Sequence, residues 1–176
     1  MIRPQTKEKL SKLMKRPNAR CYAQWAQQKD NYLTYTNGWY LIQLHNPNDK
    51  DGLYNYMWSE QSGTYPNING VLPNFNTMKP IDNADNFFQI INNIKPSNKK
   101  SSVYITINGS IGIVTGKQTA NTGDYNKDLP AFDLRLIQEI LLVMPFDSAY
   151  MSEDNQTLIF KNDNTEHRAI LVALSS

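Results

Sequence analysis

The sequence has a single cysteine, Cys21, and only two histidines, His45 and His167. One thiol excludes an intrachain disulfide and a cysteine metal cage, and the two histidines lack the short spacing of a zinc motif. No apolar run approaches the ~18 residues that span a bilayer, and no signal-peptide core follows the basic N-terminus. These absences predict a soluble, cytoplasmic protein with no membrane partner, no metal and no other cofactor.

Net charge is small but unevenly distributed along the chain. The formal charge is +2 over 176 residues, so we expect no overall field that attracts polyanions. Within residues 1–20, however, seven cations face one acid, Glu8, and the remaining chain is therefore mildly acidic. A basic arm on a mildly acidic body indicates a local anionic partner.

The motifs of phosphate-loop, calcium and thiol chemistry are incomplete in this sequence. The segment Gly112–Thr119 contains Gly-Lys, but Gln118 stands where a phosphate loop needs a hydroxyl for magnesium. In the polar loop that faintly resembles a calcium site, Pro47 replaces the first acidic ligand and Trp58 the closing glutamate. A lone Cys21 is more typical of a core position than of a nucleophile. We therefore predict a protein that is not an enzyme.

A basic amphipathic helix is predicted over residues 7–16, capped by Thr6 and ended by Pro17. Its apolar positions share one side: Leu10, Leu13 and Met14. Four cations lie opposite: Lys9, Lys12, Lys15 and Arg16. Two interpretations stay open. These side chains form a solvated surface, or, together with Arg20, they contact the phosphates of double-stranded DNA without reading its sequence.

Apolar periodicity and turn residues predict the remaining elements. Three strands of a meander are expected at 20–28, 31–36 and 39–44, with a further strand around Tyr54–Trp58. The later elements are an edge strand at 77–81, a helix at 83–94, a hairpin of 103–107 and 111–115 around Asn108-Gly109, a polar loop from Gln118 to Asp128, an apolar helix from Phe132 to Met144, and closing strands at 149–151, 157–160 and 167–174. This order predicts an α+β fold with antiparallel sheets and three helices.

The segment 63–73 joins the two halves of this pattern. It has no charge and contains two prolines and two glycines, which disfavour a helix or a central strand. Its apolar residues, Tyr65, Ile68, Val71 and Leu72, still favour burial. We therefore expect an ordered connector that is strapped across a surface.

Tyr65-Pro66-Asn67 and Val71-Leu72-Pro73 in this connector resemble the Phe-Pro-Asp-Tyr…Val-Leu-Pro linker between the last two domains of the bacterial beta sliding clamp of DNA polymerase. Three further segments support the resemblance. Phe132-Asp133 and the helix that follows resemble the Phe-Asn…Leu helix of the clamp family. Residues 33–41 resemble its Thr-Asp-Gly-His-Arg-Leu turn, and residues 169–176 resemble its C-terminal strand.

The resemblance implies a DNA-clamp-like fold with a defined division of the chain. Residues 1–62 would form a partial unit of helix and meander, 63–76 the connector, and 77–176 a complete C-terminal domain. Clamps of this family encircle duplex DNA with six such domains, and a hydrophobic pocket near the C-terminus takes client peptides. Carried over to this sequence, the peptide-binding pocket would consist of Thr36, Gly38, Leu41, Pro73, Val172 and Leu174.

The function that this resemblance implies is that of a non-enzymatic, sliding-clamp-like DNA replication accessory protein. Its expected partners are double-stranded DNA, replication proteins or their client peptides, and further copies of the chain in a homo-oligomer. Two departures matter: only the first predicted helix is basic, and Val172-Ala173-Leu174 replaces the Met-Pro-Met of the family. One chain also holds too few domains to close a ring alone. The alternative is a phage or mobile-element module that engages or mimics replication proteins without encircling DNA.

Overall fold

The computed structural model describes residues 2–16, 20–81, 84–93, 103–107, 111–115, 118–120, 131–154, 156–162 and 164–173. The α-helices of this part are α1 (Pro4–Met14), α2 (Ala84–Asn93) and α3 (Leu134–Val143). Its strands are β1 (Trp25–Lys29), β2 (Tyr32–Thr36), β3 (Tyr40–His45), β4 (Gly52–Asn55), β5 (Glu60–Gln61), β6 (Lys79–Pro80), β7 (Val103–Ile107), β8 (Ile111–Thr115), β9 (Gln118–Ala120), β10 (Ala131–Asp133), β11 (Ser148–Met151), β12 (Thr157–Asn162) and β13 (His167–Val172). None of the described helices is long and apolar enough to cross a membrane.

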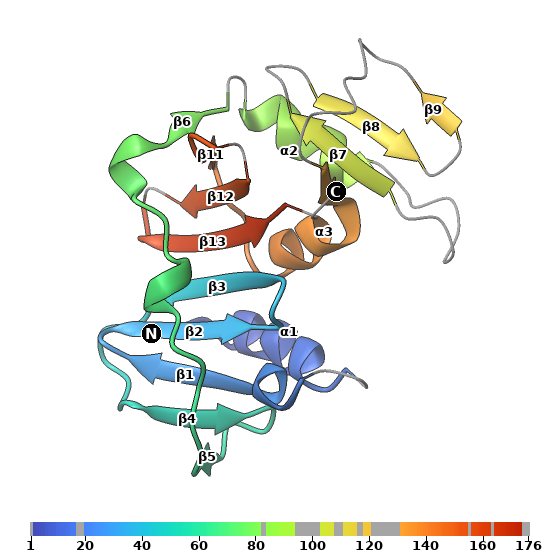
Figure 1. The fold of residues 1–176 in the computed structure, drawn as a ribbon. Coiled ribbons are helices and arrows are strands. Elements are labelled where there is room, and N and C mark those ends of the chain that lie inside the picture. The colour runs from blue at the N-terminus through green and yellow to red at the C-terminus, as the bar shows by residue number, and fades with distance from the viewer. Residues whose placement is uncertain are drawn as a thin grey trace.

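Antiparallel pairing joins nine of these strands in one sheet, in the order β5-β4-β1-β2-β3-β13-β12-β11-β6 (Figure 1). At its centre β3 pairs with β13, so that Ile42 lies opposite Ala169. The second sheet has the order β10-β7-β8-β9. The predicted α+β class with antiparallel sheets is thereby confirmed. The division at residues 62 and 76 stays a prediction, because the nine-stranded sheet includes strands from both sides of it.

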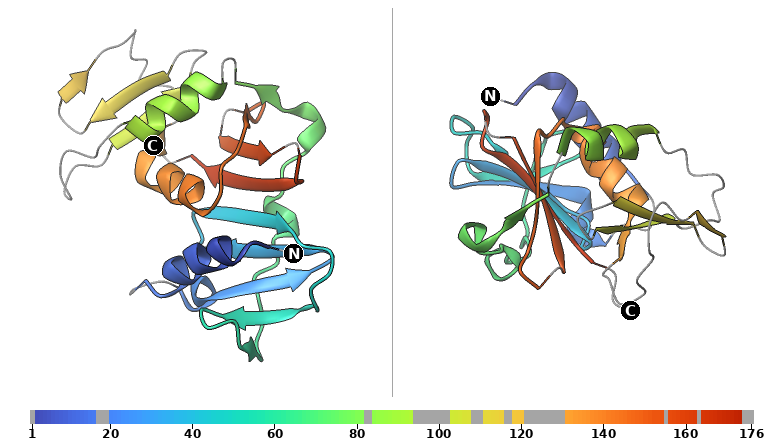
Figure 2. Two further views of the ribbon diagram at one scale, coloured as in Figure 1. Left: turned by 180° about the vertical axis from the view of Figure 1, so that it is seen from behind. Right: turned by 90° about the horizontal axis from the view of Figure 1, so that it is seen from above.

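The nine-stranded sheet has a helix face and a connector face. Figure 2 shows the three helices on one side of this sheet and the connector on the other. Because side chains alternate along a strand, Ile42 and Leu44 of β3 pack on the helix face, whereas Leu41 packs on the connector face. The helix face carries the larger apolar cluster. The smaller cluster on the connector face is centred on Leu41, Ile159 and Ile170.

The helix α1 begins earlier than its capping pattern predicts. Pro4 occupies the first turn, where its fixed φ suits a helix, and Arg3 is the N-cap without a side-chain cap bond. The prediction that Thr6 caps the helix is therefore wrong, and its N–H donates to the Arg3 carbonyl at 3.0 Å. The predicted apolar side is correct, since the three residues Leu10, Leu13 and Met14 are buried.

Two of the predicted strands are partly wrong. Residues Cys21–Gln24 form a 3-10 helix, and the strand begins only at Trp25. The strand expected around Tyr54–Trp58 ends at Asn55, whose side-chain oxygen accepts two N–H bonds from the turn that follows. Trp58 has a φ of +63°, and its indole N–H donates to the Ser11 hydroxyl at 3.0 Å. Of the alternating aromatic residues, Tyr54 is thus part of β4, whereas Tyr56 and Trp58 follow the strand and contact Lys15 and Ser11.

The second sheet and α3 follow the predicted pattern in part. The prediction that Phe132 and Asp133 open the helix is wrong, because they form β10 and α3 begins at Leu134. The hairpin strands are β7 and β8, with Ile105 opposite Ile113, and its predicted turn at Asn108-Gly109 lies outside the described residues. The expected loop from Gln118 begins instead with β9. Helix α3 is capped by Asp133, whose carboxylate accepts the N–H of Arg135 at 2.8 Å. The capped helix places its apolar side chains between the two sheets.

Candidate functional site

The turn between β2 and β3 is held by side-chain hydrogen bonds. The Thr36 hydroxyl donates to the Tyr40 carbonyl at 2.6 Å and accepts the Gly38 N–H at 3.1 Å. The Asn37 side-chain oxygen accepts the backbone N–H groups of Trp39 and Tyr40 at 2.9 and 3.1 Å. Gly38 has a φ of +91°, and a Cβ there would lie 2.5 Å from the Tyr22 hydroxyl. The positive φ therefore favours glycine, whereas the close contact is with the end of a side chain that can shift.

The connector is anchored by Tyr65, whose ring is buried and whose hydroxyl donates to the Thr34 carbonyl at 3.2 Å. Burial raises the pKa of Tyr65, so the hydroxyl keeps its proton and remains a donor. Further along the connector, Ile68 and Leu72 pack against the cluster that contains Leu41. Three of the four apolar residues of the connector therefore pack on the sheet as predicted, whereas Val71 is 55% exposed.

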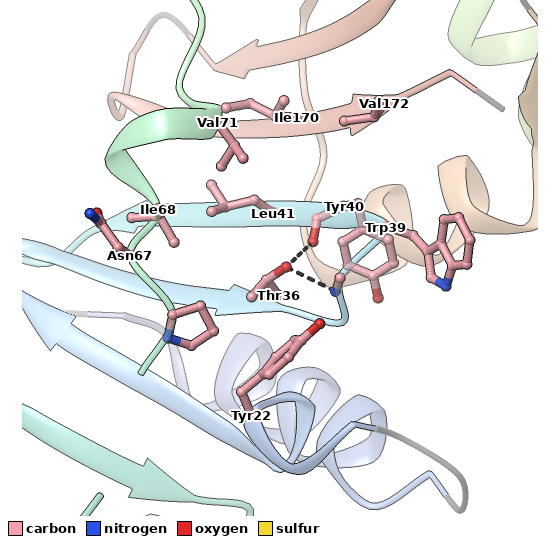
Figure 3. A pocket seen from close by; sticks show the side chains of 12 residues that line it. Tyr22, Thr36, Trp39, Tyr40, Leu41, Asn67, Ile68, Val71, Ile170 and Val172 are labelled. Carbon is pink, nitrogen blue, oxygen red and sulfur yellow. Dashed lines mark hydrogen bonds between the residues drawn. The ribbon is translucent and has the colours of Figure 1, made fainter. Parts of the chain in front are cut away.

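A groove of 160 Å³ opens between the β2–β3 turn, the connector and the end of β13 (Figure 3). It is lined by Tyr22, Thr36, Gly38, Trp39, Tyr40, Leu41, Pro66, Asn67, Ile68, Val71, Ile170 and Val172. Trp39, Val71 and Val172 are 56%, 55% and 51% exposed. The described residues of this lining include no charged side chain, so the groove offers apolar contacts to a ligand. Its volume suits one or two apolar side chains of a larger ligand.

The structure brings four of the six residues of the predicted peptide pocket to this groove: Thr36, Gly38, Leu41 and Val172. Pro73 is not among the lining residues, although its neighbour Leu72 packs against the cluster below the groove. Leu174 lies outside the described residues. Sequence reasoning missed Tyr22 and Trp39. The available signal was an aromatic residue directly after the glycine of a tight turn.

Arg16, one of the predicted DNA-contacting cations, forms an ion pair with Glu139 of α3. The same carboxylate accepts the Tyr40 hydroxyl at 3.2 Å. Burial raises the pKa of Tyr40, and burial together with Glu139 raises that of Tyr35 to about 12, so both phenols stay neutral. The position of Arg16 favours a structural role in joining α1 to α3. Lys9, two turns earlier, borders a separate cavity.

The other predicted DNA-contacting cations have different surroundings. Lys12 lies 2.8 Å from the carboxylate of Glu8, and both side chains are exposed. The ammonium of Lys15 lies 4.8 Å from the centre of the Tyr56 ring. Arg20 is exposed and donates to the tyrosine hydroxyl at the end of the groove, at 2.9 Å. The predicted cationic surface is therefore partly neutralised, whereas the exposed cations Lys15 and Arg20 each contact a tyrosine.

No protein-family model and no curated protein matches the sequence. Solved structures do match. The C. crescentus beta sliding clamp superposes with a TM-score of 0.65 at 12% identity, over 98% of this chain and 64% of that one. The Bartonella birtlesii clamp, DNA polymerase III subunit beta bound to griselimycin, gives 0.63 at 17% identity over 97% and 64%. The Bacillus subtilis clamp gives 0.61 at 10% identity over 97% and 62%.

This chain therefore spans less than two thirds of the length of these clamps, while nearly all of it takes part in the match. At sequence identities of 10–17%, these matches show a similar fold and nothing further. The clamp-like fold that the connector and the β2–β3 turn predicted is confirmed. The chain has the fold of the bacterial DNA polymerase III beta sliding clamp.

Proposed function

We propose that the chain is a non-enzymatic, clamp-like replication accessory protein whose groove binds the apolar side chains of a client peptide. One observation carries this proposal: residues 36–41, 66–71 and 170–172 meet in a single apolar groove. Its most exposed apolar side chains, Trp39, Val71 and Val172, have no charged neighbour among the described lining residues. Apolar surface that stays in contact with water around a preformed groove is typical of a binding site.

The groove predicts that Val172→Glu weakens ligand binding at least tenfold. A carboxylate at this position would face apolar side chains, and its desolvation costs more than the roughly 1.4 kcal/mol that corresponds to tenfold. The test is isothermal titration of the full chain with griselimycin, which the B. birtlesii clamp binds. Because Val172 is half exposed, the variant is expected to fold.

Leu142→Glu is the matched control for this experiment. Leu142 is 54% exposed on α3 and does not line the groove, so the same charge change there should leave griselimycin affinity within twofold. Equal weakening by both substitutions would contradict the groove as the site. Absence of griselimycin binding, together with failure of replication-protein peptides to bind, would remove the proposed function.

The second part of the proposal is contact with the DNA backbone through α1 and its C-cap, supported by the exposed cations Lys12 and Lys15. We expect the wild-type chain to bind a 30-base-pair duplex weakly, with an affinity that falls as salt increases. The double change of Lys12 and Lys15 to glutamate is expected to weaken this binding about tenfold or more. Fluorescence anisotropy at about 50 mM salt measures it. Lys29→Glu, at the end of β1, is the control that changes charge elsewhere.

The alternative is an interaction module, such as a phage or mobile element would encode, that engages replication proteins without encircling DNA. The ion pairs of Arg16 with Glu139 and of Lys12 with Glu8 favour it, because they reduce the positive field of α1. Groove binding without any duplex binding at low salt would support this alternative. Light scattering with and without DNA would show whether the chain assembles into a homo-oligomer that could enclose a duplex.

A further inference from the structure

A second cavity, of 520 Å³, lies at the opposite end of β3 and β13 from the groove. It is bordered by the start of α1, the end of α3 and the turn between β12 and β13. Its lining is formed by Ile2, Arg3, Gln5, Thr6, Lys9, His45, Pro47, Val143, Met144, Pro145, Asn162, Thr165 and His167. This set shares no residue with the groove, so the two sites can be tested separately.

The charge of this cavity is positive. Arg3 and Lys9 carry full charges, and the described residues of the lining include no carboxylate. The first turn of α1 has no acidic residue, so its N-terminal partial charge of about +0.5 is not offset locally. The C-terminal end of α3 contributes about −0.5 in the opposite sense. The two partial charges cancel to first order, and the two cations decide the sign.

His167 adds a hydrogen-bonding group rather than a further fixed charge. The Nδ1 of His167 accepts the backbone N–H of His45 at 2.9 Å, so the proton of the neutral ring is on Nε2. Burial, followed by the nearby His45, lowers the pKa of His167 and keeps this ring neutral at pH 7. The Nε2 of His45 lies 3.5 Å from the carboxylate of Glu166, which is not part of the lining. His167 therefore supplies a neutral donor beside the two cations.

The apolar side of the cavity is formed mainly by Met144 and Pro145, because Ile2 and Val143, which also line it, are only 7% and 1% exposed. A bare anion would contact only the two cations. A ligand with a ring attached to its phosphates would contact both the cations and the apolar side. A volume of 520 Å³ is within the range of small-molecule sites. We propose that this cavity binds a small ligand of the nucleoside diphosphate class, with its phosphates at Arg3 and Lys9 and its ring against the apolar side. This goes beyond the function proposed for the groove.

Isothermal titration of the full chain with ADP tests this proposal, with inorganic pyrophosphate as the probe for the phosphate part alone. We expect one ADP per chain, bound more tightly than pyrophosphate. Arg3→Gln and Lys9→Gln should each weaken ADP binding about tenfold, since each removes a charged phosphate contact. The control is Lys12→Gln on the same helix, whose ammonium pairs with Glu8 and does not line the cavity. It should leave ADP affinity unchanged.

Three results would overturn the assignment: no ADP binding at millimolar concentration, ADP binding that is equal in Lys9→Gln and Lys12→Gln, or displacement of ADP by a short DNA duplex. Equal affinities for ADP and pyrophosphate would overturn the role of the apolar side. Griselimycin binding should be the same in Lys9→Gln as in the wild-type chain, because the groove has a different lining. Failure of the nucleotide site is therefore distinguishable from failure of the groove.

Discussion

Replacing Phe160 by alanine is expected to lower the free energy of unfolding by about 3–5 kcal/mol. Phe160 lies on β12 with no exposed surface. Its ring centre is 6.2, 6.0 and 5.9 Å from those of Phe87, Phe88 and Phe146, respectively. Truncation leaves a cavity where α2 packs on the sheet, and the loss combines the transfer free energy with that of the cavity. Urea denaturation followed by circular dichroism measures it.

The control for Phe160→Ala is Leu142→Ala, because Leu142 is exposed on α3 and its removal creates no cavity. We expect this change to alter stability by no more than about 0.5 kcal/mol. A loss below about 1 kcal/mol for Phe160→Ala would contradict the aromatic cluster as the centre of the core. The free energy of unfolding should fall with urea concentration at the same slope in the wild-type chain and in both variants. An equal slope shows that the three proteins expose the same amount of surface on unfolding.

The second large effect is expected for Leu41→Ala, which should lower the free energy of unfolding by about 2–5 kcal/mol and also weaken griselimycin binding. Leu41 is buried on the connector face, where it packs with Ile159 and Ile170 beneath Ile68 and Leu72 of the connector. Its truncation removes one of the contacts that hold the connector against the sheet below the groove. Denaturation and isothermal titration of the same variant measure the two effects.

Leu44→Ala separates these two effects. Leu44 lies on the same strand, is fully buried and packs on the helix face. We expect a similar loss of stability, about 2–5 kcal/mol, without a change in griselimycin affinity under conditions where both variants are folded. The connector should also be cleaved more rapidly by a protease in Leu41→Ala alone. Equal cleavage in the two variants would show that Leu41 does not hold the connector.

The elements that rest on local patterns could be predicted from the sequence. The buried side of α1 follows from residues three and four apart, and the β7–β8 hairpin from two alternating runs around a turn. The failures have local causes too. Tyr54, Tyr56 and Trp58 alternate like a strand, but Asn55 forms a turn with its side chain, and Trp58 packs against Ser11. Periodicity alone cannot distinguish these two uses of aromatic side chains.

The candidate sites depend on contacts between segments that are far apart in the sequence. The resemblance placed Thr36, Gly38, Leu41 and Val172 in one pocket, and these four residues do line the groove. Composition gave no reason to pair Arg16 with Glu139, because that contact requires α1 and α3 to pack together. The second cavity was missed for the same reason, since its cations come from α1 and its histidines from β3 and β13.

The pairing of β3 with β13 has a consequence for how the chain folds. His45 and His167, joined by a hydrogen bond at one end of this pair, are separated by 122 positions. Closing so long a loop is slow, and strand pairs of high sequence separation form late. Until β13 has been synthesised, the edge of β3 and the apolar side chains of Leu41 and Ile42 lack their partner. We therefore expect the nascent chain to aggregate through this edge, and chaperones that bind exposed strands to raise its yield.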